Sequence, residues 1–409
     1  MNRKSKIILQ VCRYLLAVVF TFSGFVKGVD PWGSAYKFTD YFIAFNLDFL
    51  EPLSLFFSIA LSTTEFLIGL MLFLGIRPRL AAWGAFLFMI IFTPLTFVLA
   101  VFNPVSDCGC FGDAIKLTNW ETFIKNLFFL AAALFLFIGR SSFPCKLRKW
   151  DERISFVILI IIALLPSWYG YKHLPLLNFR PYKIGVNISE AMKIPDGSPA
   201  DVYKTTFFYQ KDGVVQEFDE SNYPWQDSTW QYVDSKSVLV KKGFTPEVQN
   251  FNLYSLYGNE LTDSIINKKG YHFMVISVGL DKINDKTSEQ LNKLCLFAKQ
   301  SGYDFTMVTS STEKDISTFI SRTGASFPFI NADEVLLKTI IRSNPGLMLM
   351  YNGTIIGKWH YNDIPSPEYF QGDVMAKQLK QLGSISDKRL IYLLVSLLLL
   401  VIFVKRLPY

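Results

Sequence analysis

Residues 80–102 read LAAWGAFLFMIIFTPLTFVLAVF and contain no charged side chain. A helix of about 20 apolar residues crosses the roughly 30 Å hydrocarbon core of a bilayer, so this stretch predicts a membrane span. Pro94 inside it predicts a kink. Similar apolar runs occur at about Ile7 to Gly28, Leu53 to Gly75, Phe123 to Ile138, Ile154 to Tyr171 and Leu390 to Val404. The sequence therefore predicts a multi-span α-helical membrane protein that lies in a lipid bilayer.

Composition separates the chain into two kinds of sequence. It is 51% hydrophobic and 18% charged, whereas soluble proteins carry roughly a quarter charged residues. The apolar excess lies in the runs above, and residues 178–388 have the composition of a globular domain. The net charge of +7 comes largely from Lys and Arg beside the apolar runs. These cations indicate how the chain is oriented in a membrane. The sequence shows no combination of basic and aromatic residues that would indicate nucleic-acid binding.

Lys and Arg occur mainly in alternate loops, which predicts the orientation because cytoplasmic loops are enriched in them. The opposite short loops carry only Lys37 and Lys116. We expect both termini in the cytoplasm, and the loop 103–118 and residues of about 175–388 outside. The simplest location is a bacterial inner (plasma) membrane with a periplasmic domain. The cationic set comprises Arg3, Lys4, Lys6, Arg77, Arg79, Arg140, Lys146, Arg148, Lys149, Arg153, Lys405 and Arg406.

Two of the five cysteines, Cys108 and Cys110, stand one residue apart in the run DCGCFG of residues 107–112. Such a pair can close a small strained disulfide, and strain makes a disulfide easier to reduce. An oxidising compartment would permit a catalytic redox pair here. The alternatives are a structural turn or static disulfide, and half of a metal site. Zinc usually takes four ligands, no His or further Cys lies close in sequence, and we assign no metal.

Glu65 lies near the middle of the second apolar run. An ionisable group in hydrocarbon marks a functional or paired site, so Glu65 is a second candidate catalytic residue. Lys27 ends the first run. It either extends its ammonium group to the membrane surface or pairs with Glu65, although the expected depths of the two differ by several ångströms.

Three patterns together resemble the DoxX/MauE superfamily of four-helix membrane proteins, over about residues 7–140. They are Ser23-Gly24-x-x-Lys27 with Asp30-Pro31, Glu65-x-x-x-Gly69-x-x-Leu72 with Gly75, and the Cys-Gly-Cys-Phe-Gly loop. The loop is the most specific and resembles the methylamine utilisation protein MauE branch. That resemblance implies a helper in maturing a disulfide-rich dehydrogenase subunit, with the cysteine loop periplasmic. The DoxX branch implies quinone-coupled electron flow, with quinone as a possible cofactor.

The remainder predicts a small β subdomain followed by an α/β sheet. The first hairpin, Val202 to Gln210 and Val214 to Phe218, flanks a Lys-Asp-Gly turn. From about residue 245, strands and helices alternate and end in a hairpin and a helix, which predicts an α/β sheet. The expected strands are Tyr271 to Leu280, Tyr303 to Ser310, Leu347 to Tyr351 and Thr354 to His360. The expected helices are Asn284 to Gln300, Glu313 to Thr323, Glu334 to Ile341 and Glu368 to Leu382.

This order resembles the thioredoxin-like superfamily, through residues 251–253, 257–260 and Asn344-Pro345-Gly346. The resemblance implies a cis peptide bond before Pro345, beside a groove that holds a partner. The family's Cys-x-x-Cys is missing from residues 279–284. The domain therefore lacks the thiolate nucleophile of this chemistry. Its remaining cysteine, Cys295, does not replace it, because Cys295 is expected to be buried in a helix face. The whole chain resembles DoxX-type proteins of Bacteroides and their relatives, which fuse a MauE-like bundle to a degenerate thioredoxin-like domain.

We expect five regions: 1–140, the DoxX/MauE-like four-helix bundle; 141–175, a cytoplasmic loop and fifth span; 176–244, the aromatic-rich β subdomain; 245–386, the thioredoxin-like periplasmic domain; and 387–409, a C-terminal span and cytoplasmic tail. Three functions stay open. The first is a membrane thiol–disulfide component that exchanges with a periplasmic client protein or thiol carrier, with an oxidoreductase-like activity if the chain is an enzyme. The others are a non-catalytic assembly or binding protein and a quinone-linked respiratory subunit.

Overall fold

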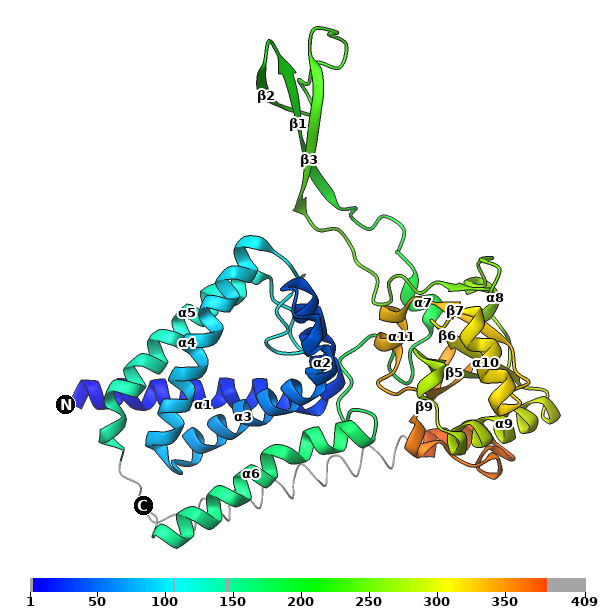
Figure 1. The fold of residues 1–409 in the computed structure, drawn as a ribbon, viewed down its shortest axis with the longest axis horizontal. Helices are drawn as coiled ribbons and strands as arrows, with labels where there is room; N and C mark the ends of the chain where they lie inside the picture. The colour runs from blue at the N-terminus through cyan, green and yellow to red at the C-terminus, as the bar shows by residue number, and fades with distance from the viewer. Residues whose placement is uncertain (1–2, 106, 144–147, 381–409) are drawn as a thin grey trace.

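The computed structural model describes residues 3–105, 107–143 and 148–380 (Figure 1). The sixth expected span, Leu390 to Val404, lies outside the described residues, as do Lys146 and the tail cations Lys405 and Arg406.

Within the described ranges, five helical segments are long and apolar enough to cross a membrane. The multi-span helical architecture predicted from the apolar runs is therefore confirmed over this part of the chain. The segments are α1 (Arg3–Val29), the turn η1 (Asp48–Leu53) with α3 (Ser54–Leu74), α4 (Pro78–Phe102), α5 (Asn119–Ile138) with the turn η2 (Gly139–Ser142), and α6 (Lys149–Lys172).

These helices form a bundle in which α1 packs along α3, α4 packs along α5, and α6 contacts α1 and α3 (Figure 1). Two glycines set the close approach of α1 and α3. A Cβ on Gly24 would lie 2.3 Å from the Phe66 backbone nitrogen, and one on Gly69 would lie 2.3 Å from that of Thr21. Small residues allow such close contact between membrane helices.

A further helix, α2 (Pro31–Ala44), was not expected from the sequence. Its start is specified locally, because the Asp30 carboxylate accepts a hydrogen bond from the Gly33 backbone N–H and Pro31 occupies the first turn. Both residues suit these positions of a helix. α2 packs against α3 and lies at the end of the bundle nearest the second half of the chain (Figure 1).

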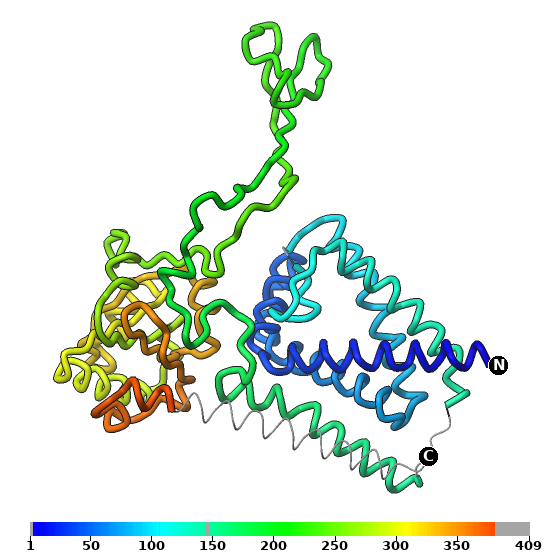
Figure 2. The backbone as a smooth tube through the Cα atoms, turned by 180° about the vertical axis from the view of Figure 1, so that it is seen from behind, coloured from blue at the N-terminus to red at the C-terminus, as the bar shows by residue number. Residues whose placement is uncertain are grey.

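A three-stranded antiparallel sheet extends away from the rest of the molecule (Figures 1 and 2). It contains β1 (Val202–Lys211), β2 (Val214–Asp219) and β3 (Gln231–Lys241), in the order β2-β1-β3. The predicted hairpin of β1 and β2 is confirmed. β3 was not predicted, because its residues are exposed on both faces and show no alternation of buried and polar positions.

The second sheet is six-stranded and mixed, with the order β4-β7-β6-β5-β8-β9. β5, β6 and β7 run parallel, whereas β4, β8 and β9 pair antiparallel with their neighbours. We call this sheet and its helices the α/β domain. Its strands are β4 (Leu253–Tyr254), β5 (Tyr271–Ser277), β6 (Asp304–Thr309), β7 (Phe329–Ala332), β8 (Gly346–Tyr351) and β9 (Thr354–His360).

Helices cover both faces of the mixed sheet because the side chains of its central strand alternate between two cores. Phe273 and Val275 of β5 pack with α9 (Asp285–Gln300) and α10 (Glu313–Thr323). The intervening Met274 and Ile276 pack on the other side, where the covering helices are α7 (Ile188–Met192), α8 (Thr262–Ile266) and α11 (Glu334–Ile340).

Two local predictions for the α/β domain are confirmed, and one is wrong. The Asn344–Pro345 bond is cis, and Cys295 is fully buried on α9. The expected continuous helix from Glu368 to Leu382 is interrupted: a short turn, η5 (Pro367–Phe370), is followed by Gly372 with φ +76° before residues 374–380 become helical. A left-handed glycine ends a helical turn readily.

Candidate functional site

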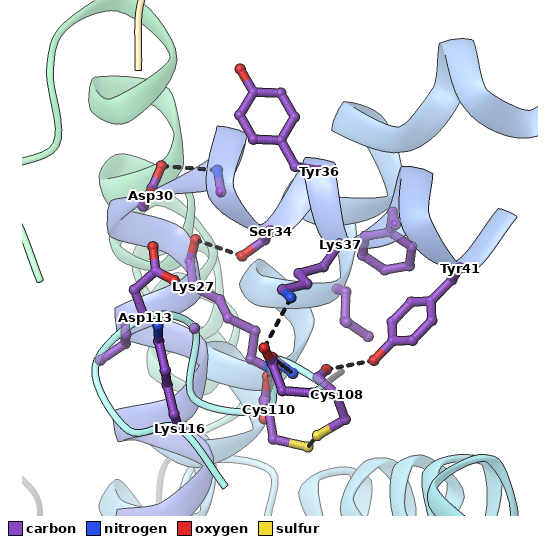
Figure 3. Close-up of a pocket in the computed structure, with 18 of the residues that line it drawn as sticks. Lys27, Asp30, Ser34, Tyr36, Lys37, Tyr41, Cys108, Cys110, Asp113 and Lys116 are labelled. Carbon is purple, nitrogen blue, oxygen red and sulfur yellow. Dashed lines mark hydrogen bonds and ion pairs between the residues drawn. The ribbon is translucent and has the colours of Figure 1, made fainter. Parts of the chain in front are cut away.

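The two cysteines of the loop between α4 and α5 face each other (Figure 3). The Sγ atoms of Cys108 and Cys110 are 2.7 Å apart, and both residues are free, half-buried thiols. Gly109 between them has φ +61°, in the left-handed region that glycine adopts without strain. The turn at Gly109 therefore brings the two sulfurs onto the same side of the loop.

Side chains of α1 and α2 hold this loop from both ends. Ser23 Oγ donates a hydrogen bond of 2.6 Å to the Cys110 carbonyl, and the Tyr41 hydroxyl donates one of 2.6 Å to the Cys108 carbonyl. Lys37 Nζ lies 3.0 Å from an Asp107 carboxylate oxygen. These contacts fix the backbone of the loop and leave the two thiols to contact each other.

The surroundings shift the pKa values of the two thiols in opposite directions. The hydrogen bond with Cys110 lowers the pKa of Cys108 to about 6, with help from Thr122, whose Oγ1 lies 3.5 Å from Cys108 Sγ, and from Lys125, although burial opposes the shift. The same hydrogen bond, together with burial, raises the pKa of Cys110 well above its ordinary value. The pair therefore favours the thiolate on Cys108 and the remaining proton on Cys110.

Lys27 and Glu65 form a buried ion pair, with Nζ 2.6 Å from Oε2. α1 carries Lys27 and α3 carries Glu65, and the close approach of these two helices brings the charges together. The pairing considered at the sequence level is thus present. A charge buried without a partner would be costly, so each of these side chains needs the other.

A cavity of about 470 Å³ connects the ion pair to the thiols (Figure 3). Lys27, Glu65, Cys108 and Cys110 all line it. Another part of its wall is apolar, from Phe88, Met89, Phe92 and Leu99 of α4. Residues of the α/β domain complete the lining, namely Val335, Lys338, Thr339 and Arg342. The structure therefore brings four of the candidate residues into one site, at the junction of bundle and α/β domain.

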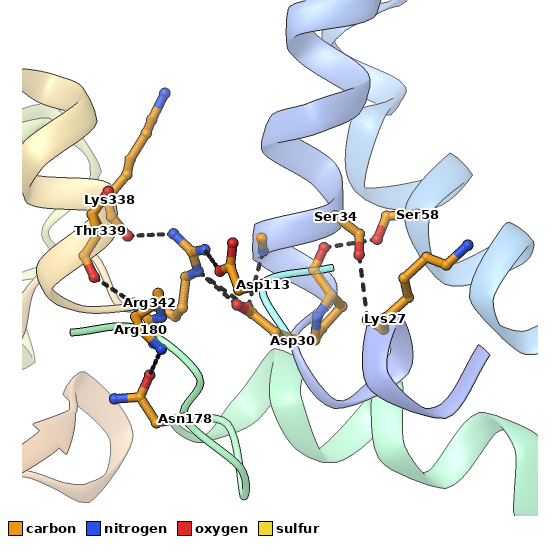
Figure 4. Close-up of polar contacts among 12 residues, drawn as sticks. Lys27, Asp30, Ser34, Ser58, Asp113, Asn178, Arg180, Lys338, Thr339 and Arg342 are labelled. Carbon is orange, nitrogen blue, oxygen red and sulfur yellow. Dashed lines mark hydrogen bonds and ion pairs between the residues drawn. The ribbon is translucent and has the colours of Figure 1, made fainter. Parts of the chain in front are cut away.

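Arg342, which sequence reasoning missed, links the two parts of the molecule (Figure 4). Its Nε lies 2.9 Å from Asp30 Oδ2 and its Nη2 lies 3.1 Å from Asp113 Oδ2. Burial favours the neutral acid at Asp30, but the charge and hydrogen bonds of Arg342 outweigh it and hold the pKa of that carboxyl below its ordinary value. Asp113 belongs to the cysteine loop, so the loop contacts the α/β domain directly.

One candidate residue, Pro345, is not part of this site. Pro345 follows Arg342 in the chain but does not line the cavity. Within the described residues, no group of three or more His, Cys, Asp or Glu side chains could hold a metal ion.

The helices and the cavity define a multi-span membrane protein with a pair of thiols where its bundle meets an α/β domain. The sequence model of the family described as methylamine utilisation protein MauE matches residues 5–139. The match covers α1 to α5, so this part of the chain is similar to that family. A family described as a domain of unknown function, DUF8463, matches residues 203–242, which contain most of the three-stranded sheet. No curated protein matches the sequence.

Proposed function

We propose that this chain is a membrane thiol–disulfide component that exchanges through Cys108 and Cys110 with a periplasmic client protein or thiol carrier. The observation that carries the proposal is the apposed pair of thiols with opposite pKa shifts, in a cavity that the α/β domain helps to line. The MauE match suggests a membrane accessory protein in methylamine utilisation. The exchange chemistry is our addition to that suggestion.

The exchange begins with the thiolate, because the thiolate is the nucleophile in such reactions. Cys108 Sγ attacks one sulfur of a client disulfide, and the other client sulfur leaves as a thiolate that takes up a proton. Cys110 then loses its proton and attacks Cys108 Sγ, which releases the second client sulfur. The client gains two electrons and becomes a dithiol, while Cys108 and Cys110 become a disulfide. The reverse sequence oxidises a client dithiol.

Lys27 and Glu65 are suited to handle the proton that Cys110 must lose. Both line the cavity beside the thiols, and the ammonium group of Lys27 favours negative charge on Cys110. In this role Glu65 acts as the proton acceptor, and Lys27 holds it in place through the 2.6 Å ion pair.

The contact of Arg342 with Asp113 supports the expected orientation. Because Asp113 of the α4–α5 loop contacts Arg342 of the α/β domain, the two lie next to each other, as expected if both are periplasmic. The α/β domain itself we assign to a thioredoxin-like fold, supported by its mixed sheet with helices on both faces. Since it lacks Cys-x-x-Cys, its role in this scheme is to position the partner.

A trapping experiment tests the proposal. The Cys110→Ser variant lacks the thiol that resolves a mixed disulfide, so the client should remain attached to Cys108 and appear as a band sensitive to reductant. Cys108→Ser, the matched control, should trap far less because it removes the attacking thiolate. Cys295→Ala should leave trapping by Cys110→Ser unchanged. Equal trapping by both loop variants, or none by either, would count against exchange.

Two alternatives have specific support. A non-catalytic assembly protein is favoured by the missing Cys-x-x-Cys and by the hydrogen bonds that hold the cysteine loop. It requires that the Cys108→Ser/Cys110→Ser double variant keep full function in cells. A quinone-linked subunit is favoured by the apolar wall of the cavity beside Glu65. It requires that the purified protein bind a quinone.

A further inference from the structure

One buried cation of the α/β domain, Arg342, contacts the bundle at two carboxylates. The Arg342 side chain is only 7% exposed, and it contacts Asp30 at the start of α2 and Asp113 in the cysteine loop. The guanidinium also lies 5.1 Å from the centre of the Tyr36 ring on α2. A buried charge that loses its partners is strongly unfavourable. Separation of the two parts must therefore expose all three charged groups to water together.

The helix just before Arg342, α11, lines the cavity that contains the sulfurs. Val335, Lys338 and Thr339 of α11 line the cavity that contains Cys108 and Cys110. Lys338 Nζ also lies 4.7 Å from the Tyr36 ring, so α11 contacts α2 directly. A cavity of about 470 Å³ accommodates a small molecule but not a folded protein. A protein client therefore reaches Cys108 only if part of the lining of this cavity moves.

We propose that α11 covers the thiol pair and that the ion pairs of Arg342 with Asp30 and Asp113 hold α11 in this closed position. We call α11 the lid and these ion pairs the latch. With the latch closed, small reagents reach Cys108 and proteins do not. With the latch open, the three charges are hydrated and the sulfurs become accessible to a protein. The purpose of opening rests on the proposed function, whereas the existence of the lid does not.

Accessibility of Cys108 measures the lid directly. The full chain is reconstituted in bilayers with Cys110→Ser and with Cys12, Cys145 and Cys295 replaced by Ala, so that Cys108 is the single thiol. The readout is the rate of modification by a maleimide carrying a polyethylene glycol chain, divided by the rate with N-ethylmaleimide. Arg342→Gln should raise this ratio at least about tenfold. Arg342→Lys, which keeps the charge, should raise it less.

The control and a double-mutant cycle separate a latch from general loosening. Lys268→Gln removes a more exposed ion pair, with Asp304 within the α/β domain at 2.5 Å, and should leave the ratio unchanged. Asp113→Asn should raise the ratio, and adding Arg342→Gln to it should give no more than Arg342→Gln alone. The proposal fails if the effects of Arg342→Gln and Asp113→Asn on the ratio multiply in the double variant, or if neither variant changes the ratio. It also fails if Lys268→Gln raises the ratio as much as Arg342→Gln does.

The measurement distinguishes this inference from the proposed function because it needs no client. If the ratio responds as expected but no mixed disulfide is ever trapped, the lid stands and the exchange fails. If a client is trapped on Cys108 while Arg342→Gln leaves the ratio unchanged, the exchange stands and the lid fails.

Discussion

Replacing Cys110 by Ala should move the titration of Cys108 toward higher pH. In the wild-type pair, the hydrogen bond with Cys110 is the main cause of the low pKa of Cys108, about 6. Without that thiol, burial raises the pKa, and Thr122, the backbone N–H of residue 110 and Lys125 still lower it. The pKa should therefore move toward that of an ordinary thiol, about 8.5. Thr122→Val should cause a smaller shift in the same direction.

The informative quantity is the pH at which the alkylation rate of Cys108 is half-maximal. The alkylation rate at pH 7 alone does not distinguish the two variants. With a pKa of about 6, roughly 90% of Cys108 is thiolate at pH 7, against about 3% for an ordinary thiol with a pKa near 8.5. The thiolate of lower pKa is also a weaker nucleophile, by about 13-fold over this interval if the Brønsted coefficient is about 0.45. The two effects nearly cancel at pH 7, because their quotient is only about twofold.

The assay is alkylation of the reduced protein by iodoacetamide from pH 4.5 to 9.5, with the modified residue identified by mass spectrometry. We expect a wild-type midpoint near pH 6 and a higher one in Cys110→Ala, while Cys295→Ala stays at the wild-type value. A wild-type midpoint between pH 8 and 9, or one that Cys110→Ala does not move, would refute the assignment of Cys108 as the attacking thiolate.

Two further predictions concern the bundle, and thermal unfolding in detergent checks both. Lys27→Met leaves the Glu65 charge buried without its partner and should lower the free energy of unfolding by about 3–5 kcal/mol. The double variant Lys27→Met/Glu65→Gln should recover most of this loss. Equal losses in the single and double variants would contradict the ion pair. Gly24→Ala places a Cβ 2.3 Å from the Phe66 backbone and should cost about 1–3 kcal/mol by overpacking. Gly84→Ala, whose Cβ meets only a flexible side chain at 3.1 Å, should cost less, and the reverse order would argue against close packing of α1 on α3.

Much of the fold follows from the sequence because its signals are local. The thickness of the bilayer requires long apolar runs, so the spans are visible without any tertiary information. α10 and β9 begin and end as predicted, since amphipathic spacing and the Asn-Gly turn before β9 are both short-range patterns. α2 was missed although Asp30-Pro31 is a helix-start signal, because its mixed composition gives no span and no clear apolar face.

The site could be predicted only in part. Cys108 and Cys110 are recognisable because two thiols one residue apart must lie close together. Arg342 is not, because its partners Asp30 and Asp113 are 312 and 229 residues away in the chain. In sequence Arg342 is one exposed-looking cation after a short helix, and only the docking of the α/β domain on the bundle buries it.

Reversible oxidation of the loop thiols tests the central claim most directly. The full chain in bilayers, with Cys12, Cys145 and Cys295 replaced by Ala, is equilibrated in buffers of reduced and oxidised glutathione and its free thiols are counted by alkylation and mass spectrometry. The account predicts that both thiols disappear together into an internal disulfide and return together on reduction. Two thiols that persist in oxidised glutathione, or a single thiol lost as a stable glutathione adduct, would contradict it.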